Sequence, residues 1–190
     1  MLALLPLVAF ALLFAQRARA CDDWRDAWME AACAWGVILW AGTEGLGALH
    51  ALDRAGAAAL WLAVGLAAAP AGIRAAPALV RRLAAAWATT PPAGRRLLGA
   101  LALLAAATGG LGLFCAPNSF DAMTYHAARV MHWMQNRSVD FYPTHIQRQN
   151  HFPPWSEFAL LQLRLLAGSD RAFHAVQWFA VFGVLPVVAR

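Results

Sequence analysis

Long apolar stretches dominate this chain, and one polar stretch interrupts them. The polar stretch, Cys115 to Glu157, holds both tyrosines, all three asparagines and four of the six histidines. Several of the apolar stretches approach the roughly 20 residues that cross a ~30 Å hydrocarbon core as a helix. They are Leu2–Ala15, Ala31–His50, Gly56–Ile73, Leu97–Phe114 and Phe173–Ala189. The pattern predicts an all-α fold, a polytopic membrane helix bundle with an external loop of juxtamembrane amphipathic helices.

Three parts are expected along the chain. Residues 1–114 would hold four transmembrane helices, and residues 115–157 an external loop of the kind that carries catalysis. Residues 158–190 would form a juxtamembrane or re-entrant helix and a final transmembrane helix. Composition agrees, because 61% of the residues are hydrophobic, 13% are charged and the mean hydropathy is +0.52. Such a chain is too apolar for a soluble domain of this length.

The basic residues predict the orientation, and all fifteen are arginine. Cytoplasmic links are enriched in arginine and lysine, so the arginine-rich links are expected inside and the polar loop on the periplasmic or external side. The net charge of +5 then needs no nucleic-acid partner. The two arginine-rich links carry Arg17, Arg19 and Arg25, and Arg74, Arg81, Arg82, Arg95 and Arg96.

The N-terminal segment is expected to be an uncleaved membrane anchor. Ala18-Arg19-Ala20 before Cys21 resembles a signal-peptidase site, but a signal peptide carries its positive charge before the apolar run, not after it. The three cysteines show neither metal-ligand spacing nor a disulfide framework.

Two further features do not fit a simple bundle. Glu44 lies inside an apolar segment, where a carboxylate is often functional; pairing with Arg54 or His50 is the alternative. Phe158–Ala167 is too short to span and contains Arg164, so it is expected to be interfacial or re-entrant, on the outer surface.

Within the polar loop, spacing predicts an amphipathic helix that begins near Asn118, the expected cap. An apolar stripe of three- and four-residue spacing can rest on the membrane. It consists of Phe120, Met123, Ala127, Val130 and Met134. A neighbouring polar stripe is expected to face a common cleft, and it consists of Asp121, Tyr125, Arg129, His132 and Asn136.

An acid, arginines and aromatic rings beside a bilayer suit transfer of a sugar from a polyprenyl-phosphate donor. A carboxylate can take the proton of the acceptor hydroxyl, and an arginine can hold the phosphate. The alternatives remain open: Asp121 can be only a helix-start residue, while Arg129 and Arg148 can bind lipid headgroups.

The string NSFDAMTYHAARVMHWMQNRSVDFYPTHIQRQNHFPPWSEFALLQL resembles the first external loop of the GT-C membrane glycosyltransferases, a group that includes protein O-mannosyltransferase-like and aminoarabinose-transferase-like proteins of bacteria. The resemblance makes Asp121 the counterpart of the catalytic acid, with Tyr125 at the spacing often seen. Pro153-Pro154-Trp155 takes the place of a Pro-Pro-Leu-like segment. Two positions depart from the family: Ala122 follows the acid where many members have glutamate, and Phe152 stands where a basic residue often precedes Pro-Pro.

The resemblance implies an inverting glycosyltransferase of the bacterial inner membrane and an N-terminal fragment of a longer protein. By this match Asp121 would be catalytic. The chemistry of the loop residues, and not the match, assigns binding of the donor phosphate or substrate to Tyr125, Arg129, Arg148 and His151. The implied partners are a polyprenyl-phosphate sugar, membrane lipids and a lipid, glycan or protein acceptor. No cofactor is assigned, and a loosely bound divalent cation is compatible with this function.

Two other classes of function are weighed against this one. A histidine-ligated metalloenzyme is disfavoured because His126 and His132, like His145 and His151, are six apart and fall on different helix faces. A noncatalytic membrane protein, such as a transporter segment or assembly subunit, would not ordinarily carry an external loop of this length.

Overall fold

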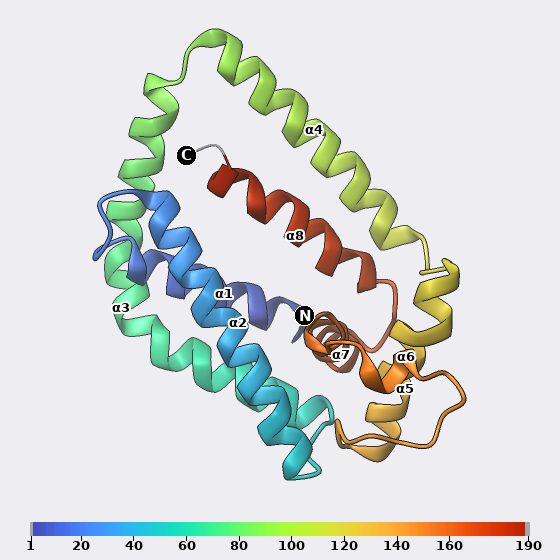
Figure 1. Ribbon diagram of the computed structural model, residues 1–190. Helices are drawn as coiled ribbons and strands as arrows, with labels where there is room; N and C mark the ends of the chain where they lie inside the picture. The colour runs from blue at the N-terminus through green and yellow to red at the C-terminus, as the bar shows by residue number, and fades with distance from the viewer. Residues whose placement is uncertain (1, 189–190) are drawn as a thin grey trace.

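The computed structural model describes residues 2–188, and these residues form helices and connecting loops without a strand (Figure 1). The predicted all-α class is confirmed. The elements are η1 (Leu2–Leu4), α1 (Leu5–Arg17), α2 (Trp24–Ala48), α3 (Arg54–Thr89), α4 (Pro92–Phe114), η2 (Ala122–His126), α5 (Ala127–Asn136), α6 (Arg148–His151), α7 (Trp155–Ala167) and α8 (Phe173–Val188).

The first three long helices pack together, and α4 lies on the opposite edge against α8 (Figure 1). Helices α1 and α3 lie close together at Gly72, where an added Cβ would lie 2.7 Å from the carbonyl oxygen of Leu12. The contact between α4 and α8 also uses a small residue, since the Trp178 ring lies over Gly109 and its Nε1 donates to the Ala105 carbonyl at 2.9 Å. Small residues therefore set the close contacts between apolar helices.

Helix α3 is longer than the sequence predicted. It continues through Pro70 and Pro77 to Thr89, so Arg74 and its neighbours lie on a helix and not in a link. Alanine and arginine are both strong helix formers, which explains the continuation. At about 1.5 Å per residue the helix is about 54 Å long, well beyond a ~30 Å hydrocarbon core. Figure 1 shows it changing direction along its length, as prolines inside a helix cause.

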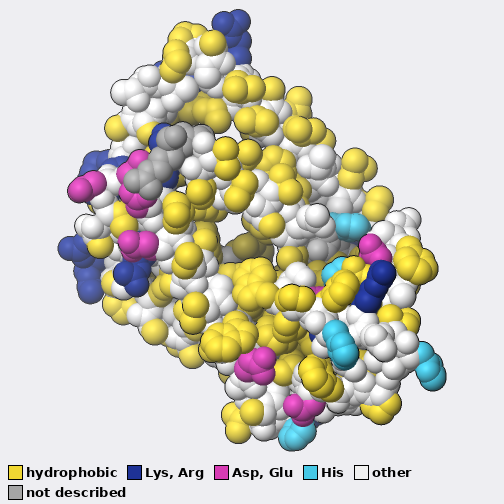
Figure 2. Space-filling view, viewed as in Figure 1, with side chains coloured by type: hydrophobic (Ala, Val, Ile, Leu, Met, Phe, Trp, Pro, Cys, Tyr) yellow, Lys and Arg dark blue, Asp and Glu magenta, His cyan; other side chains and the backbone are white. Residues whose placement is uncertain are grey.

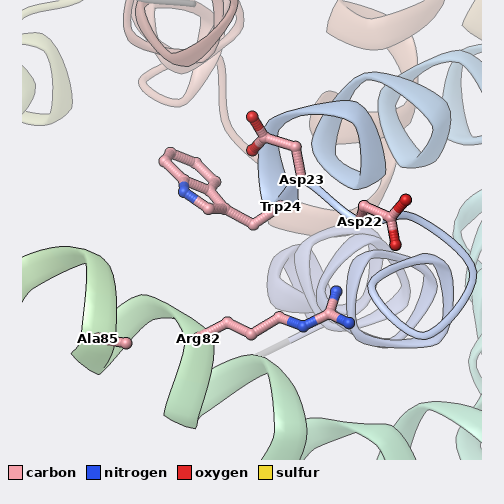
Figure 3. A pocket seen from close by; sticks show the side chains of 5 residues that line it. All are labelled: Asp22, Asp23, Trp24, Arg82 and Ala85. Atoms are coloured by element: carbon pink, nitrogen blue, oxygen red, sulfur yellow. The ribbon is translucent and has the colours of Figure 1, made fainter.

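One of these arginines closes the end of α1. The guanidinium of Arg82 donates to the carbonyl oxygens of Ala18 and of Cys21, the latter at 2.6 Å. These carbonyls follow the C-terminus of α1, where the helix dipole favours a cation. Figure 3 shows Arg82 reaching from α3 toward the turn that begins α2, beside a pocket. The pocket is lined by Asp22, Asp23, Trp24, Arg82 and Ala85.

Helix α7 lies inside the protein, and its expected interfacial or re-entrant position relative to the membrane stays a prediction. The structure encloses α7 among α2, α3, α5 and α8, and Figure 1 views it end-on in the middle of the molecule. Its one buried amide, Gln162, accepts from Trp61 Nε1 at 3.2 Å and donates to Thr43 Oγ1 at 3.1 Å. Helix α7 carries apolar residues on every side, and its consecutive residues from Glu157 to Gln162 are all buried.

Among the residues that the structure describes, two helices, α3 and α4, are long and apolar enough to cross a membrane. The apolar helical segments Leu2–Arg17 and Phe173–Leu185 are shorter. Helix α2, which covers the predicted span Ala31–His50, is not among the two and exposes Glu44. In α4 no residue is buried. Its large side chains, including Leu103 and Phe114, point away from the protein.

Candidate functional site

The polar loop begins with a helix whose first turns are wider than an α-helix. Ser119 Oγ accepts from the Ala122 backbone N–H at 3.2 Å, so Ser119 caps this helix. The prediction that Asn118 is the cap is therefore wrong. Residues 122–126 form a π-helix, η2, before α5 starts. A π-turn shifts the helical phase, so residues at three- and four-residue spacing no longer share one face.

The predicted stripes are divided accordingly. Phe120 and Met123 of the apolar stripe are exposed, whereas Val130 is completely buried. The polar stripe is divided as well, because Asp121 is exposed while Arg129 is only 2% exposed. The expectation that the polar stripe faces one cleft is therefore wrong.

An exposed cluster forms around Asp121. Arg148, from the short helix α6, brings Nη1 to 3.9 Å from the Asp121 carboxylate, and both side chains are more than half exposed. The guanidinium of Arg148 also lies over the rings of Tyr125 and Phe152, at 6.0 and 5.9 Å from their centroids. We call these four residues the Asp121 cluster. It joins an acid, a cation and two aromatic faces at the end of α4 that leads into the polar loop.

Hydrogen bonds of the Gln149 side-chain amide hold α6 beside η2. Gln149 is buried, and its Nε2 donates to the Thr124 carbonyl of η2 at 2.7 Å. Its Oε1 accepts from the Tyr142 hydroxyl at 3.1 Å and from Thr144 Oγ1 at 2.8 Å. Desolvation raises the pKa of Tyr142 despite the opposing charge of Arg129, so its hydroxyl remains a donor. The neighbouring Arg148 is thereby positioned beside η2.

Arg129 does not belong to the Asp121 cluster. Its Nη1 donates to the Phe152 carbonyl at 2.9 Å and lies 3.5 Å from Glu157 Oε1. Its guanidinium also lies 4.9 Å from the ring centroid of Trp133. A side chain held in this way points inward, so the structure does not bring Arg129 together with Asp121, and its contact with a donor phosphate stays a prediction. His151, the other predicted ligand, is exposed on α6 in the turn that begins with Arg148.

A buried carboxylate and a histidine form a second group, which sequence reasoning missed. Glu157, at the start of α7, is 1% exposed and its Oε1 lies 2.9 Å from His126 Nδ1. Its Oε2 accepts from the Ser156 hydroxyl at 2.7 Å. The sequence did carry a signal for this group, because Glu157 directly precedes the apolar segment Phe158–Ala167. A carboxylate that is buried with such a segment requires polar partners. We call Glu157, His126, Arg129 and Ser156 the Glu157 cluster.

The two clusters adjoin one another. The ring of Tyr125, on which Arg148 rests, lies with its centroid 4.1 Å from that of His126. The candidate site thus runs from exposed Asp121 inward to Glu157, with η2 contributing residues to both clusters.

Within residues 2–188, no group of three or more His, Cys, Asp and Glu side chains is arranged to hold a metal ion. We therefore expect the purified protein to carry no stoichiometric zinc or iron, as elemental analysis would measure. About one metal per chain, lost in both His126→Ala and His132→Ala, would contradict this prediction and revive the metalloenzyme.

Comparisons with protein-family models, with curated proteins and with solved structures find no match for this chain. Functional proposals for it rest on the residues of the site.

Proposed function

We propose that this protein is an integral membrane glycosyltransferase of the GT-C type, which transfers a sugar from a polyprenyl-phosphate donor to an acceptor hydroxyl at the membrane surface. The observation that carries the proposal is the Asp121 cluster. It places an exposed carboxylate beside an exposed guanidinium, and the carboxylate follows shortly after the end of an apolar helix that is long enough to cross a bilayer. A base for the acceptor and a cation for the donor phosphate are the two groups that this transfer requires.

Membrane insertion is supported by α4. A helix that is apolar on every side and buries none of its residues exposes a large apolar surface, which water does not tolerate well. Lipid covers such a surface without further protein. The side-chain distribution agrees, because most of the arginines visible in Figure 2 lie along the upper and left margins, and the visible histidines lie on the right and lower right, on the side of α5 and α6. We infer that the arginine-rich side faces the cytoplasm and the histidine-rich loop the periplasm.

The roles in this proposal follow from exposure and charge. Asp121 accepts the proton of the acceptor hydroxyl, whose oxygen attacks the anomeric carbon of the sugar. Arg148 contacts the phosphate and stabilises the charge that develops as the bond to it breaks. Tyr125 and Phe152 provide aromatic faces beside the arginine. A single displacement with one carboxylate acting as base inverts the anomeric configuration.

The direct test is a transfer assay. Membranes that contain the protein are incubated with a radiolabelled polyprenyl-phosphate sugar and membrane-derived acceptors, and labelled product is counted. Transfer that depends on both Asp121 and Arg148 supports the proposal. Sugar transfer that is absent from the wild-type protein with every donor sugar offered would refute it.

Membrane orientation is tested separately by cysteine labelling. In a variant without Cys21, Cys33 and Cys115, His145→Cys should react with an impermeant maleimide in intact cells, because the side chain is exposed on the polar loop. Ala85→Cys, on the arginine-rich part of α3, should react only after permeabilisation. The reverse pattern would place the Asp121 cluster in the cytoplasm and contradict the proposed periplasmic reaction.

A further inference from the structure

We propose that His126 is the acid of the transfer reaction, held in position by Glu157, and that it protonates the phosphate oxygen that leaves the sugar. The inference rests on the proposed function and adds a second catalytic residue to it. It is carried by the geometry of the Glu157 cluster, which the roles of Asp121 and Arg148 do not use.

The first observation is the bond between the two side chains. Glu157 Oε1 lies 2.9 Å from His126 Nδ1, and the carboxylate is almost completely enclosed. A carboxylate accepts only, so Nδ1 must carry a proton in this contact. The second ring nitrogen, Nε2, is then the one that exchanges protons with a ligand, as in other carboxylate–histidine pairs. The His126 side chain is 33% exposed, which leaves the ring within reach of the surface.

The second observation is the charge around the ring. Within the described residues, Glu157 from α7 and the Tyr125 ring from η2 face the His126 ring, and Arg129 from α5 and the Ser156 hydroxyl face Glu157. Arg129 already balances the charge of Glu157 at 3.5 Å. An imidazolium at His126 therefore gives the Glu157 cluster a net positive charge, which suits a phosphate ligand. Tyr125 connects the ring to Arg148, the proposed phosphate contact.

The third observation is the rigidity of this arrangement. The other carboxylate oxygen of Glu157 is held by Ser156, and Arg129 is held by the Phe152 carbonyl. Phe152 lies in the segment that joins α6 to α7, and Ser156 lies in the first turn of α7. A ring oriented by fixed partners loses little entropy when it donates to a ligand, which is the usual requirement for an acid in a catalytic site.

The chemical step balances without another reactant. The acceptor oxygen forms a bond to the anomeric carbon, and its proton goes to Asp121. The bond between the anomeric carbon and the phosphate oxygen breaks, and its electron pair stays on that oxygen. The proton of His126 Nε2 then moves to the same oxygen, which leaves a neutral imidazole still donating through Nδ1 to Glu157. Solvent returns the proton from Asp121 to His126.

The orientation of the ring can be measured without any activity. The protein is labelled with ¹⁵N-histidine in detergent micelles, and its spectrum at alkaline pH is compared with that of His126→Gln to identify the signals of His126. We expect the neutral ring to carry its proton on Nδ1, which ¹⁵N chemical shifts distinguish from Nε2. A proton found on Nε2 would overturn the assignment of Glu157 as the positioning residue.

The acid role is measured by transfer kinetics. We expect His126→Gln to lower kcat at least about 10²-fold with little change in KM for the donor, because proton transfer by a positioned group contributes on this scale. The pH profile of kcat should also differ between the wild-type protein and this variant, because only the wild-type protein carries the proton donor. His132→Gln is the matched control. The His132 ring lies half-buried on α5 and stacks on Tyr142, away from Glu157. We therefore expect His132→Gln to keep the pH profile of the wild-type protein.

Glu157→Gln tests the positioning residue, with circular dichroism as the check on folding; kcat should fall while KM stays. Because this change also weakens the pair with Arg129, His126→Gln is the decisive variant. Transfer that Asp121→Asn abolishes but His126→Gln leaves at the wild-type rate and pH profile would overturn the acid role and leave the proposed function intact. Absence of transfer in the wild-type protein would refute the proposed function itself.

Discussion

Replacing Asp121 by asparagine is expected to lower the rate of sugar transfer by about 10²–10⁴-fold, the range in which a general base contributes. That loss corresponds to roughly 3–5 kcal/mol of activation free energy. Asparagine keeps the size of the side chain and also tolerates a helix start. The pair with Arg148 joins two exposed groups at 3.9 Å, so its loss should cost little stability. The effect on turnover therefore reports chemistry.

The measurement is the initial rate of transfer in membranes with matched protein levels. Asp140→Asn is the control, since it makes the same change on an exposed residue of the same loop, where the carboxylate accepts from Ser138 Oγ. We expect it to retain the wild-type rate. Equal rates for Asp121→Asn and the wild-type protein would show that Asp121 is only a helix-start residue.

Arg148→Ala separates binding from chemistry at the same cluster. If the guanidinium holds the donor phosphate before reaction, KM for the donor should rise more than kcat falls. A loss confined to kcat would place the contact in the transition state alone. An unchanged KM and kcat would remove Arg148 from the site.

The largest effect on stability is expected for Glu157→Ala, about 3–5 kcal/mol, which is the usual cost of leaving a buried charge without its partner. Arg129 is 2% exposed and its Nε has no partner within the described residues, so water cannot replace the carboxylate. The substitution also removes the acceptor of His126 and Ser156. A large decrease in the unfolding free energy in detergent micelles is therefore expected.

Glu30→Ala provides the comparison for this prediction. The same side chain is removed there from a pair with Arg17 at 3.7 Å, but both partners are about half exposed. Exposed pairs contribute ~0–1 kcal/mol, so the unfolding transition should barely move. Similar destabilisation by the two substitutions would mean that the buried pair of Glu157 and Arg129 contributes no more to the unfolding free energy than an exposed pair.

Much of the helical content follows from the sequence alone. The apolar stretches are long enough, and their alanine and leucine content high enough, to specify helices in any packing arrangement. The polar stretch from Cys115 to Glu157 was recognisable by composition, and Asp121 near its beginning was singled out as a candidate acid. These properties are local, which is why hydropathy and spacing reveal them.

Tertiary contacts decided which polar residues meet. Spacing grouped Arg129 with Asp121, but a π-turn between them changes the phase, and the buried carboxylate of Glu157 pairs with Arg129. The meeting of Arg148 with Asp121 depends on the bonds of Gln149 to η2. No periodic pattern encodes a contact between distant segments of a loop.

The position of α7 is the clearest case of this division. Its sequence determined a short apolar helix with a glutamate at the start and a glutamine in the middle. Whether that helix lies on the bilayer or inside the protein depends on partners in other helices. Trp61 and Thr43 satisfy Gln162, and Arg129 with His126 satisfies Glu157. A buried polar group is tolerated only where such partners converge, and the folded chain alone determines where that is.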